Sequence, residues 1–471
     1  MSFESSFDLL PNWQLKTVQE LVNEKILEKP LDGNHGGIHP KASDYVEEGI
    51  PFVMASDLEA GLINFSSCKH ISPQQAGTLR KGFAKEGDVL LSHKATIGRT
   101  AIVQPNDNEY IVLTPQVTYY RVKDETKLNN IYLKSYFDSY FFQTILNQWA
   151  GSGSTRAYLG ITEQLKLPVI VPPIESQIEI ASFAHNFNSK IHLNTQINQT
   201  LESIAQAIFK SWFIDFDPVR AKIAAKQEGK DAELAAMCMI SGKSEEELKQ
   251  MSKDDFAELQ ATAALFPDEL VESELGEVPK GWEYKKLKNL CRVINGRAYK
   301  NTEFKEEGIP IVRIQNLTGG GKTVFSDLDL PQDKLIEKED FIYAWSATFG
   351  PYIWRGPKSI YHYHIWKMDV DETIISRYFL YLTMFRKTES MKSAGTGSIF
   401  THLTKVIMES QDVLIADNAI NMLFKDRIDK IFKLISLKSD EIKNLKNIRD
   451  TLLPKLLSGK VEIPDFINEG E

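Results

Sequence analysis

The chain lacks long apolar runs, paired cysteines and a basic amino terminus. No hydrophobic stretch approaches the roughly 18 to 20 residues that a membrane helix needs, and the opening residues MSFESSFDLL do not resemble a signal peptide. The three cysteines, Cys68, Cys238 and Cys291, are odd in number and far apart, which fits neither a disulfide framework nor a zinc site. We therefore expect a cytoplasmic protein with buried or idle thiols.

The chain also has no excess of positive charge. Its formal net charge of −9 argues against nucleic-acid binding when it is taken as a bulk quantity. The acidic residues are concentrated, however: residues 221–281 hold fourteen Asp and Glu against seven Lys, which leaves only −2 for the rest of the chain. Two nearly neutral regions with local basic clusters remain able to bind phosphate. With 471 residues and 42% hydrophobic content, we expect two or three domains.

What the sequence does contain is an internal repeat. The stretch GIPFVMASDL at residues 49–58 returns as GIPIVRIQNL at 308–317. Likewise GDVLLSHKATIG at 87–98 matches EDFIYAWSATFG at 339–350, and GSGSTRAYL at 151–159 matches GTGSIFTHL at 395–403. The offset between the copies drifts as loops differ in length. A repeat of this size indicates one structural unit that is present twice.

Each copy begins with short β-rich runs, such as residues 111–120 and 359–368, and continues with a long helical pattern. The helical patterns, residues 174–213 and 416–457, have heptad-like apolar positions interrupted by Lys190, Asn194 and Lys438. A helix of about 39 residues would be roughly 58 Å long and cannot bury its apolar stripe alone. We therefore predict an α+β fold of two mixed α/β domains joined by two long antiparallel coiled-coil helices, with pseudo-twofold symmetry.

These patterns divide the chain into six predicted segments. They are a first domain at 1–173, a first long helix at 174–218, an acidic helical linker at 219–275, a second domain at 276–415, a second long helix at 416–457 and a tail at 458–471.

Two stretches suggest other chemistry. TGGGKT at 318–323 ends like a phosphate-binding P-loop, but the first glycine of that motif would fall on Asn316. A glycine-rich hairpin turn is the ordinary interpretation, and a basic loop that reaches toward DNA is a second one. His362 and His364 in YHYHIW could bind a metal, but they lack nearby Cys or carboxylate partners and fit strand residues that flank a core or a DNA groove. We find no methyltransferase, dinucleotide-binding or helicase motif, and we predict no catalytic machinery in this chain.

Polar, basic and aromatic residues gather at corresponding loops of the two copies. Arg, Lys, Asn and Gln match the donors and acceptors of base edges, and Ser and Thr suit phosphates. Each such residue alone is more often a solvated surface group, and the recurrence in both copies favours DNA contact. His93 opens the first of these loops. The predicted DNA-binding residues are Lys94, Thr96, Arg99, Ser154, Thr155, Arg156 and Tyr158 in the first copy, and Arg313, Gln315, Asn316, Lys322, Trp345, Ser346, Arg355, Thr401 and His402 in the second.

Three further strings carry a family resemblance. KSWFIDFDPV at 210–219, ESELGEVPKGW at 272–282 and RDTLLPKLLSGKVEI at 449–463, in this order, resemble the specificity subunits of type I restriction-modification enzymes. The resemblance spans nearly the whole chain and implies a bacterial or archaeal protein.

The resemblance implies a non-catalytic, sequence-specific DNA-binding subunit. Each globular domain would read one half of a bipartite double-stranded DNA target, and the helices would set the spacing and dock two methyltransferase subunits, with restriction-translocase subunits joining the complex. The chain itself would hold no cofactor, since S-adenosylmethionine, ATP and magnesium would belong to the partners. Two alternatives remain: a coiled-coil adaptor that holds two protein-binding domains without DNA, and a P-loop NTPase that depends on Lys322.

Overall fold

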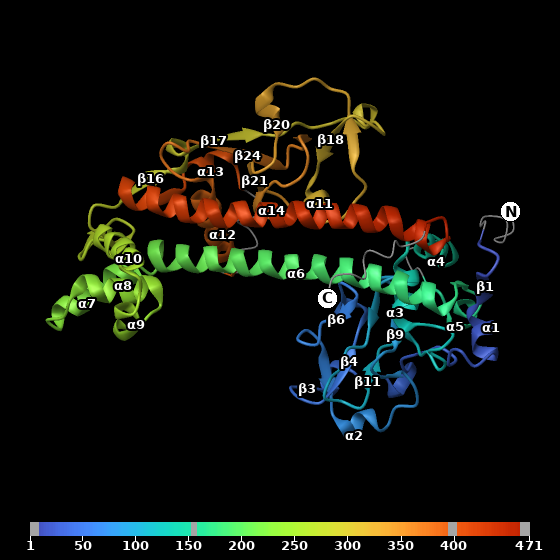
Figure 1. Cartoon of the computed structure of the whole chain (residues 1–471). Helices are drawn as coiled ribbons and strands as arrows, with labels where there is room; N and C mark the ends of the chain where they lie inside the picture. Colours follow the sequence, from blue (N-terminus) through green and yellow to red (C-terminus); the bar gives the residue numbers. More distant parts are fainter. Residues whose placement is uncertain (1–8, 152–157, 394–402, 462–471) are drawn as a thin grey trace. The chain divides into compact units, whose positions relative to one another are not determined.

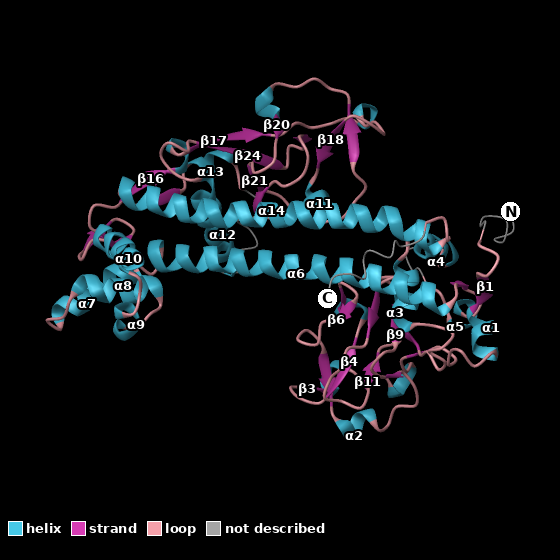
Figure 2. Cartoon of the chain, in the orientation of Figure 1, coloured by secondary structure: helices cyan, strands magenta, loops and turns pink. Residues whose placement is uncertain are grey.

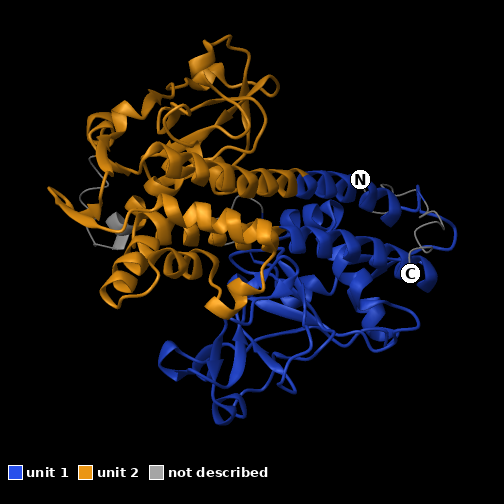
Figure 3. Ribbon diagram, turned by 60° about the vertical axis from the view of Figure 1, so that its left-hand side comes forward, with its two compact units in different colours: residues 1–194, 441–471 blue, residues 195–440 orange. Residues whose placement is uncertain are grey.

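The structure is a computed structural model that describes residues 9–151, 158–393 and 403–461 (Figure 1). The chain forms two compact units: unit 1 comprises residues 1–194 and 441–471, and unit 2 comprises residues 195–440 (Figure 3). Among the helices of the described ranges, none combines the length and apolarity that crossing a membrane requires.

Unit 1 is built mainly from short strands, with helices at its carboxyl end (Figure 2). Its elements are β1 (Gln14–Thr17), α1 (Val18–Asn23), β2 (Leu31–Asp32), β3 (Tyr45–Val46), β4 (Ile50–Val53), β5 (Leu58–Glu59), β6 (Leu62–Ile63), β7 (Lys69–Ile71), α2 (Pro73–Ala76), β8 (Phe83–Ala84), β9 (Val89–Ser92), β10 (Thr100–Ile102), β11 (Ile111–Leu113), β12 (Val117–Tyr120), α3 (Asn130–Asp138), α4 (Tyr140–Trp149), α5 (Ile161–Gln164), β13 (Pro168–Val171) and the first part of α6 (Ile174–Phe213). We call the part from β1 to β13 the first domain.

After four intervening helices, unit 2 contains a second set of short strands and helices in a similar order. Its elements are the rest of α6, then α7 (Asp217–Gln227), α8 (Ala232–Ser241), α9 (Glu245–Lys249), α10 (Lys253–Leu265), β14 (Leu270–Ser273), β15 (Gly276–Pro279), β16 (Glu283–Lys286), β17 (Cys291–Asn295), β18 (Ile309–Val312), α11 (Ile314–Leu317), β19 (Val324–Ser326), β20 (Leu335–Ile336), β21 (Phe341–Ala344), β22 (Gly350–Ile353), β23 (Ser359–Tyr361), β24 (Ile365–Val370), α12 (Arg377–Ser393), α13 (Lys405–Glu409), β25 (Asp412–Ile415) and the first part of α14 (Asn418–Leu457). We call the part from β16 to β25 the second domain.

The sheets of the two domains share the order of their main strands, although the second sheet has five strands (β3-β7-β4-β11-β8) in the first domain and four (β19-β18-β23-β20) in the second. The four-stranded sheet β10-β9-β12-β2 of the first domain corresponds to β22-β21-β24-β17 of the second. In the other sheet, β4 and β11 run parallel, as do β18 and β23. A two-stranded antiparallel pair then joins the start and end of each domain, β1 with β13 and β16 with β25. This agreement confirms the internal duplication that the sequence predicts.

Strand register agrees as well as strand order. Ser92 pairs with Val117 in the first domain, and Ala344 pairs with Ile365 in the second. Ser92 and Ala344 are equivalent under the sequence repeat, and Val117 and Ile365 are the first residues of the equivalent strands β12 and β24. Because a slip of one residue would turn every side chain to the other face, equal register means that equivalent side chains share equivalent surroundings.

The two long helices pack together and run antiparallel within each unit. In unit 1, the Arg449 guanidinium donates to the Asn188 side chain at 2.6 Å, and Lys190 lies 3.6 Å from Glu441. In unit 2, Asn198 donates to Ser439 at 3.2 Å. As residue numbers rise along α6, those of the partners on α14 fall. Each unit thus contains one part of each helix.

Both domain cores include apolar side chains of these helices. In unit 2, Phe213 of α6 and Phe424 of α14 have ring centroids 4.9 Å apart, and both contact Phe379 of α12. In unit 1, Ala184 of α6 and Leu456 of α14 belong to the core that also holds strand residues. The apolar stripe of each helix is therefore buried against a domain as well as against the other helix.

The predicted acidic linker forms a small helical module with its own core. Asp231, Ser244 and Ser252 cap the amino ends of α8, α9 and α10 by accepting backbone N–H bonds, and Gly242 ends α8 at a φ of 69°. The core of the module is formed by small and aliphatic side chains such as Met237. These local signals explain why an acidic segment folds instead of remaining extended.

Phe424 gives a test of the shared core. Replacing this fully buried residue by Ala should lower the free energy of unfolding by about 3–5 kcal/mol, because a large cavity forms among four aromatic rings. The matched control is Met422→Ala on the same helix, where the side chain is 49% exposed and a change within about 0.5 kcal/mol is expected. Urea unfolding measures both, and equal effects would contradict the packing described.

Candidate nucleic-acid interface

One end of the four-stranded sheet carries an equivalent pair of loops in each domain. Loop A follows β9 or β21 and comprises residues 93–98 or 345–350; turn B comprises residues 114–116 or 362–364 and precedes β12 or β24. The His93 N–H donates to the Gln116 carbonyl at 2.9 Å, and the equivalent Trp345 N–H donates to the His364 carbonyl at 3.1 Å. Loop A and turn B therefore meet in both domains.

Loop A has an unusual backbone at the same place in both copies. Ala95 has a φ of 64° and Ala347 has a φ of 57°, in the left-handed region that residues with a Cβ rarely adopt. Such conformations are stabilised by their surroundings and are common where a loop presents side chains to a ligand. The next residue is a threonine in both copies, Thr96 and Thr348.

In the first domain, His93 anchors the segment that carries Tyr158. The imidazole Nδ1 lies 3.0 Å from the Leu159 carbonyl, and the Leu159 N–H donates to the His93 carbonyl at 3.0 Å. Burial lowers the pKa of His93, and the nearby Asp32 carboxylate partly opposes this. His93 is therefore a neutral structural group that places its neighbour Lys94, whose ammonium lies 5.9 Å from the exposed Tyr158 ring.

Thr96 on loop A and Arg99, which directly follows this loop, are both exposed. The Arg99 guanidinium donates to the carbonyls of Ala55 and Ser56 at 3.2 Å each, which holds it against a neighbouring turn. The other predicted residues of the first copy, Ser154, Thr155 and Arg156, lie outside the described residues, as do Thr401 and His402 of the second.

In the second domain, aromatic and imidazole rings cover loop A and turn B. The Trp345 ring lies 5.3 Å from the His364 ring and 6.4 Å from the Tyr363 ring, and the indole N–H donates to the Tyr363 carbonyl at 2.8 Å. Ser346, beside Trp345, is partly exposed. His364 lies in a turn, so the predicted strand placement is wrong for it, whereas His362 directly follows β23 and forms an isolated parallel β-bridge with Arg297.

Arginines flank these rings. Arg297 packs over the Tyr299 ring at 5.1 Å, and Tyr299 lies 6.4 Å from the His362 ring. The positive charge of Arg313 is one of the influences that lower the pKa of His362, after burial and His364. Basic groups interleaved with rings are typical of nucleic-acid surfaces. Of these rings and arginines, Trp345 and Arg313 are in the predicted set, whereas His362 and His364 were expected only to flank a core or a DNA groove, and the two strings YHYHIW and LTPQVT share no residue that would reveal the turn.

The glycine-rich stretch 318–323 is a connection between antiparallel strands. It runs from α11 to β19, which pairs with β18, and Lys322 is exposed with its ammonium 3.5 Å from Glu306. The Asn316 side chain accepts the Arg313 N–H at 3.0 Å, and Gln315 is exposed. A P-loop instead joins a strand to the start of a helix. The hairpin interpretation is therefore confirmed and the P-loop alternative is wrong.

Arg355 is not brought together with the other predicted residues. Its Nε lies 3.5 Å from Glu339, which precedes β21, whereas Trp345 follows this strand. The carboxylate of Glu339 also accepts from the Tyr378 hydroxyl at 3.0 Å. Arg355 thus faces helix α12 at the opposite end of β21.

Neither metal ligation nor thiol chemistry has support in the described part of the chain. The His362 and His364 rings are 4.9 Å apart, but no group of three or more His, Cys, Asp or Glu side chains among these residues is arranged to hold a metal ion. Burial raises the pKa of Cys68 and of Cys291 to about 12, so both remain protonated thiols at neutral pH.

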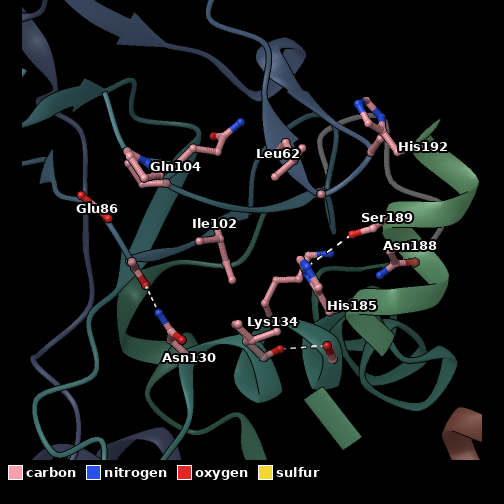
Figure 4. A pocket seen from close by; sticks show the side chains of 17 residues that line it. Leu62, Glu86, Ile102, Gln104, Asn130, Lys134, His185, Asn188, Ser189 and His192 are labelled. Carbon is pink, nitrogen blue, oxygen red and sulfur yellow. Dashed lines mark hydrogen bonds between the residues drawn. The ribbon is translucent and has the colours of Figure 1, made fainter. Parts of the chain in front are cut away.

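A cavity of about 420 Å³ lies in unit 1 between the first domain and α6 (Figure 4). Leu62 and Ile102 give it an apolar wall, and its polar groups are engaged: Lys134 pairs with Asp138 at 2.7 Å, and His185 is hydrogen-bonded to Ser189 at 3.3 Å. The predicted site residues within the described ranges are not among those that line it. The cavity is therefore a weaker candidate for the functional site than loop A and turn B.

Comparison with known proteins identifies the family. The profile described as "Type I restriction modification DNA specificity domain" matches residues 12–203 and 279–447. The chain belongs to this family. The segment between the matches contains α7 to α10, so the helical module lies outside the part that the family profile describes.

Two relatives and one solved structure agree with this membership. The chain is 32% identical to the type I restriction enzyme HindI specificity subunit of Haemophilus influenzae, over 80% of this chain and 87% of that protein. It is 24% identical to the MjaIX specificity subunit of Methanocaldococcus jannaschii, over 92% and 91%. The S subunit of a type I restriction-modification system from M. genitalium has the same fold, with a TM-score of 0.52 and 12% identity, covering 97% of this chain and 98% of that one. The chain is thus a type I specificity subunit by family and fold.

The left-handed residues of loop A give a test of the site geometry in this specificity subunit. Ala95→Gly and Ala347→Gly should each raise the free energy of unfolding by about 1 kcal/mol, because glycine adopts positive φ without a Cβ clash. The control, Ala181→Gly inside α6, should lower it by about 1 kcal/mol. Destabilisation by both loop substitutions in urea unfolding would contradict the strained backbone.

Proposed function

We propose that this subunit binds double-stranded DNA at a bipartite site and that each domain reads one half. The observation that carries the proposal is the equivalence of loop A and turn B in two domains of similar topology, which carry different polar and aromatic side chains. Equal scaffolds with unequal side chains suit two different short sequences. Membership in the DNA specificity family supports the proposal.

In the proposed interface, exposed or partly exposed side chains of loop A and the residues beside it contact the DNA from each domain. Lys94, Thr96 and Arg99 belong to the first domain. Trp345 and Ser346 belong to the second, with Arg313 on the adjacent segment and Lys322 on the glycine-rich connection. Arginine matches the two acceptors of guanine, whereas Lys and Ser suit phosphates. The net charge is compatible with this role because the acidic residues are concentrated in the helical module.

The proposal assigns the long helices to spacing and to two methyltransferase subunits. Both helices have 40 residues, and each exposes apolar side chains at the same three positions: Ile178, Leu193 and Ile204 on α6, and Met422, Leu437 and Ile448 on α14. Each position on α14 is 244 residues after its equivalent on α6. At 3.6 residues per turn, the three fall within about 80° of one another on each helix. Two equal apolar stripes support docking of two copies of one partner.

No catalytic step is assigned to this chain. Methyl transfer and DNA cleavage would belong to partner subunits, which would also hold S-adenosylmethionine, ATP and magnesium. The restriction-translocase subunits would join through the assembled complex. The target adenine would be flipped into the methyltransferase pocket, because its amino group is not accessible to that chemistry inside the base stack.

Binding of duplex DNA at varied salt tests the proposal against the adaptor alternative. The subunit in complex with its cognate methyltransferase should lose about 10³-fold or more in affinity between 50 and 200 mM salt, because phosphate contacts release counterions. Fluorescence anisotropy with a labelled duplex that carries the methylated motif measures this. An adaptor without DNA contacts would show no such binding at any salt concentration.

Single substitutions test the division into half-sites. Arg99→Ala should weaken discrimination at the first half-site only, and Arg313→Ala at the second only, each by about 1–3 kcal/mol if the guanidinium contacts a base. The control is Arg292→Ala: Arg292 is also exposed in the second domain, but it pairs with Asp369 at the far end of β17 and β24. Methylome sequencing reads both half-sites, and loss at the unrelated half-site would contradict independent reading.

A helix insertion tests the assignment of spacing. Four residues inserted near Asn194 would lengthen α6 by ~6 Å, close to two base pairs at ~3.4 Å each, and would add about one helical turn, which a coiled coil tolerates. We expect a gap that is longer by one or two bases, with both half-sites retained. Insertion after Gly229, an open position between α7 and α8, should leave the gap unchanged. An unchanged gap in the first variant would rule out α6 as the spacer.

A further inference from the structure

Turn B has the same backbone in both domains. The N–H of Thr114 donates to the Val53 carbonyl at 3.0 Å, and the N–H of the equivalent His362 donates to the Val312 carbonyl at 2.9 Å. The turn then closes in the same way, since Val117 donates to Thr114 at 3.1 Å and Ile365 to His362 at 2.9 Å. Together with the bond from loop A described above, three hydrogen bonds fix each turn at equivalent atoms.

A glycine lies against each turn. A Cβ on Gly33 would lie 2.4 Å from the Thr114 carbonyl carbon, and a Cβ on Gly296 would lie 2.6 Å from the equivalent His362 carbonyl carbon. These contacts are shorter than any that a Cβ can make with backbone atoms. Both domains therefore require glycine at this place, and the approach of two backbone segments makes the turn a rigid platform.

Only the side chains of the platform differ. The first domain presents Pro115 and Gln116, with Thr114 buried before them, whereas the second presents His362, Tyr363 and His364. Tyr363 is 40% exposed, and its ring lies 3.9 Å from that of His364. The second turn thus offers two imidazoles and a phenol where the first offers the amide of Gln116.

Polar atoms beside the second turn have no protein partner among the described residues. They are one terminal nitrogen of Arg297, the Nε of Arg313 and the Tyr299 hydroxyl, all shielded from solvent. The other terminal nitrogen of Arg297 is bound to Glu303 at 2.6 Å. Arg297 also accepts the N–H of Tyr363 on its carbonyl at 3.1 Å, so its donors lie close to the turn. Unpaired donors next to exposed rings suit a ligand with acceptors and flat faces, as a DNA base has.

We propose that turn B is the specificity-determining element of each domain: His362, Tyr363 and His364 contact the bases of the second half-site, and Pro115 and Gln116 occupy the same place over the first. The inference rests on the proposed DNA function and adds which side chains distinguish one sequence from another. Trp345 and Tyr363 supply flat faces for stacking or for thymine methyl groups. The imidazoles and Gln116 supply the hydrogen-bonding groups for base edges.

The test is a triple substitution that keeps every backbone N–H: His362→Thr, Tyr363→Ala and His364→Gln, in the full chain with its methyltransferase. Methylome sequencing should show an altered or degenerate second half-site and an unchanged first one. Discrimination against single-base changes in the second half-site, measured by competition binding, should fall about 5- to 150-fold. Gln116→His should instead alter the first half-site and leave the second unchanged.

Two variants guard against a folding defect. Tyr363→Ala alone removes an exposed ring and should already relax the second half-site, and Tyr140→Ala, an 82% exposed tyrosine of α4, should change neither half-site. Two outcomes for the triple variant would overturn the inference: an unchanged methylated motif, or a uniform loss of affinity for all sequences with the motif retained. In both cases the unaltered complex would still show salt-dependent DNA binding. Absence of DNA binding by the unaltered complex would instead refute the proposed function.

Discussion

The burial of both long helices against both domains is the interaction on which the remaining structure depends. A helix of 40 residues with one apolar stripe is not stable by itself in water, because most helical stability comes from tertiary packing. Here α6 and α14 contribute aromatic and aliphatic side chains to the cores of both units. The helices therefore do not merely connect finished domains. They are part of the interior of each domain, and this fixes the base from which the loops extend.

The two copies of the repeated unit have a similar backbone but different side chains at the loops. Strand order, register, the left-handed alanines of loop A and the glycines beneath turn B agree between the domains, whereas the side chains above them differ. The rings of the second domain, such as Trp345 and Tyr363, stand on backbone positions that carry smaller groups in the first. A specificity subunit benefits from such a division, because a side chain on a fixed turn can change without cost to the core.

The sequence allowed the architecture to be predicted because the repeat and the apolar periodicity extend over many residues. The GIP strings fall on β4 and β18, and the helical patterns coincide with α6 and α14. The site was less predictable, since it depends on contacts between segments distant in sequence. No local sequence signal identifies Gly296 as the neighbour of His362. Arg355 is of a residue type that often contacts DNA, but it pairs with Glu339. Turn B was missed because alternation in YHYHIW suggests a strand, whereas the chain bends there.

Unit 1 contains segments from both ends of the chain, which affects the order of folding during synthesis. Leu453, Leu456 and Leu457 complete a core whose other members include Trp13 and Val18, more than 430 residues earlier. A ribosome makes about 5–20 residues per second, so the first domain emerges long before the helix that closes its core. Unit 2, which is contiguous from residue 195 to 440, can finish first. The part of the protein that is translated first is thus the last to reach its final state.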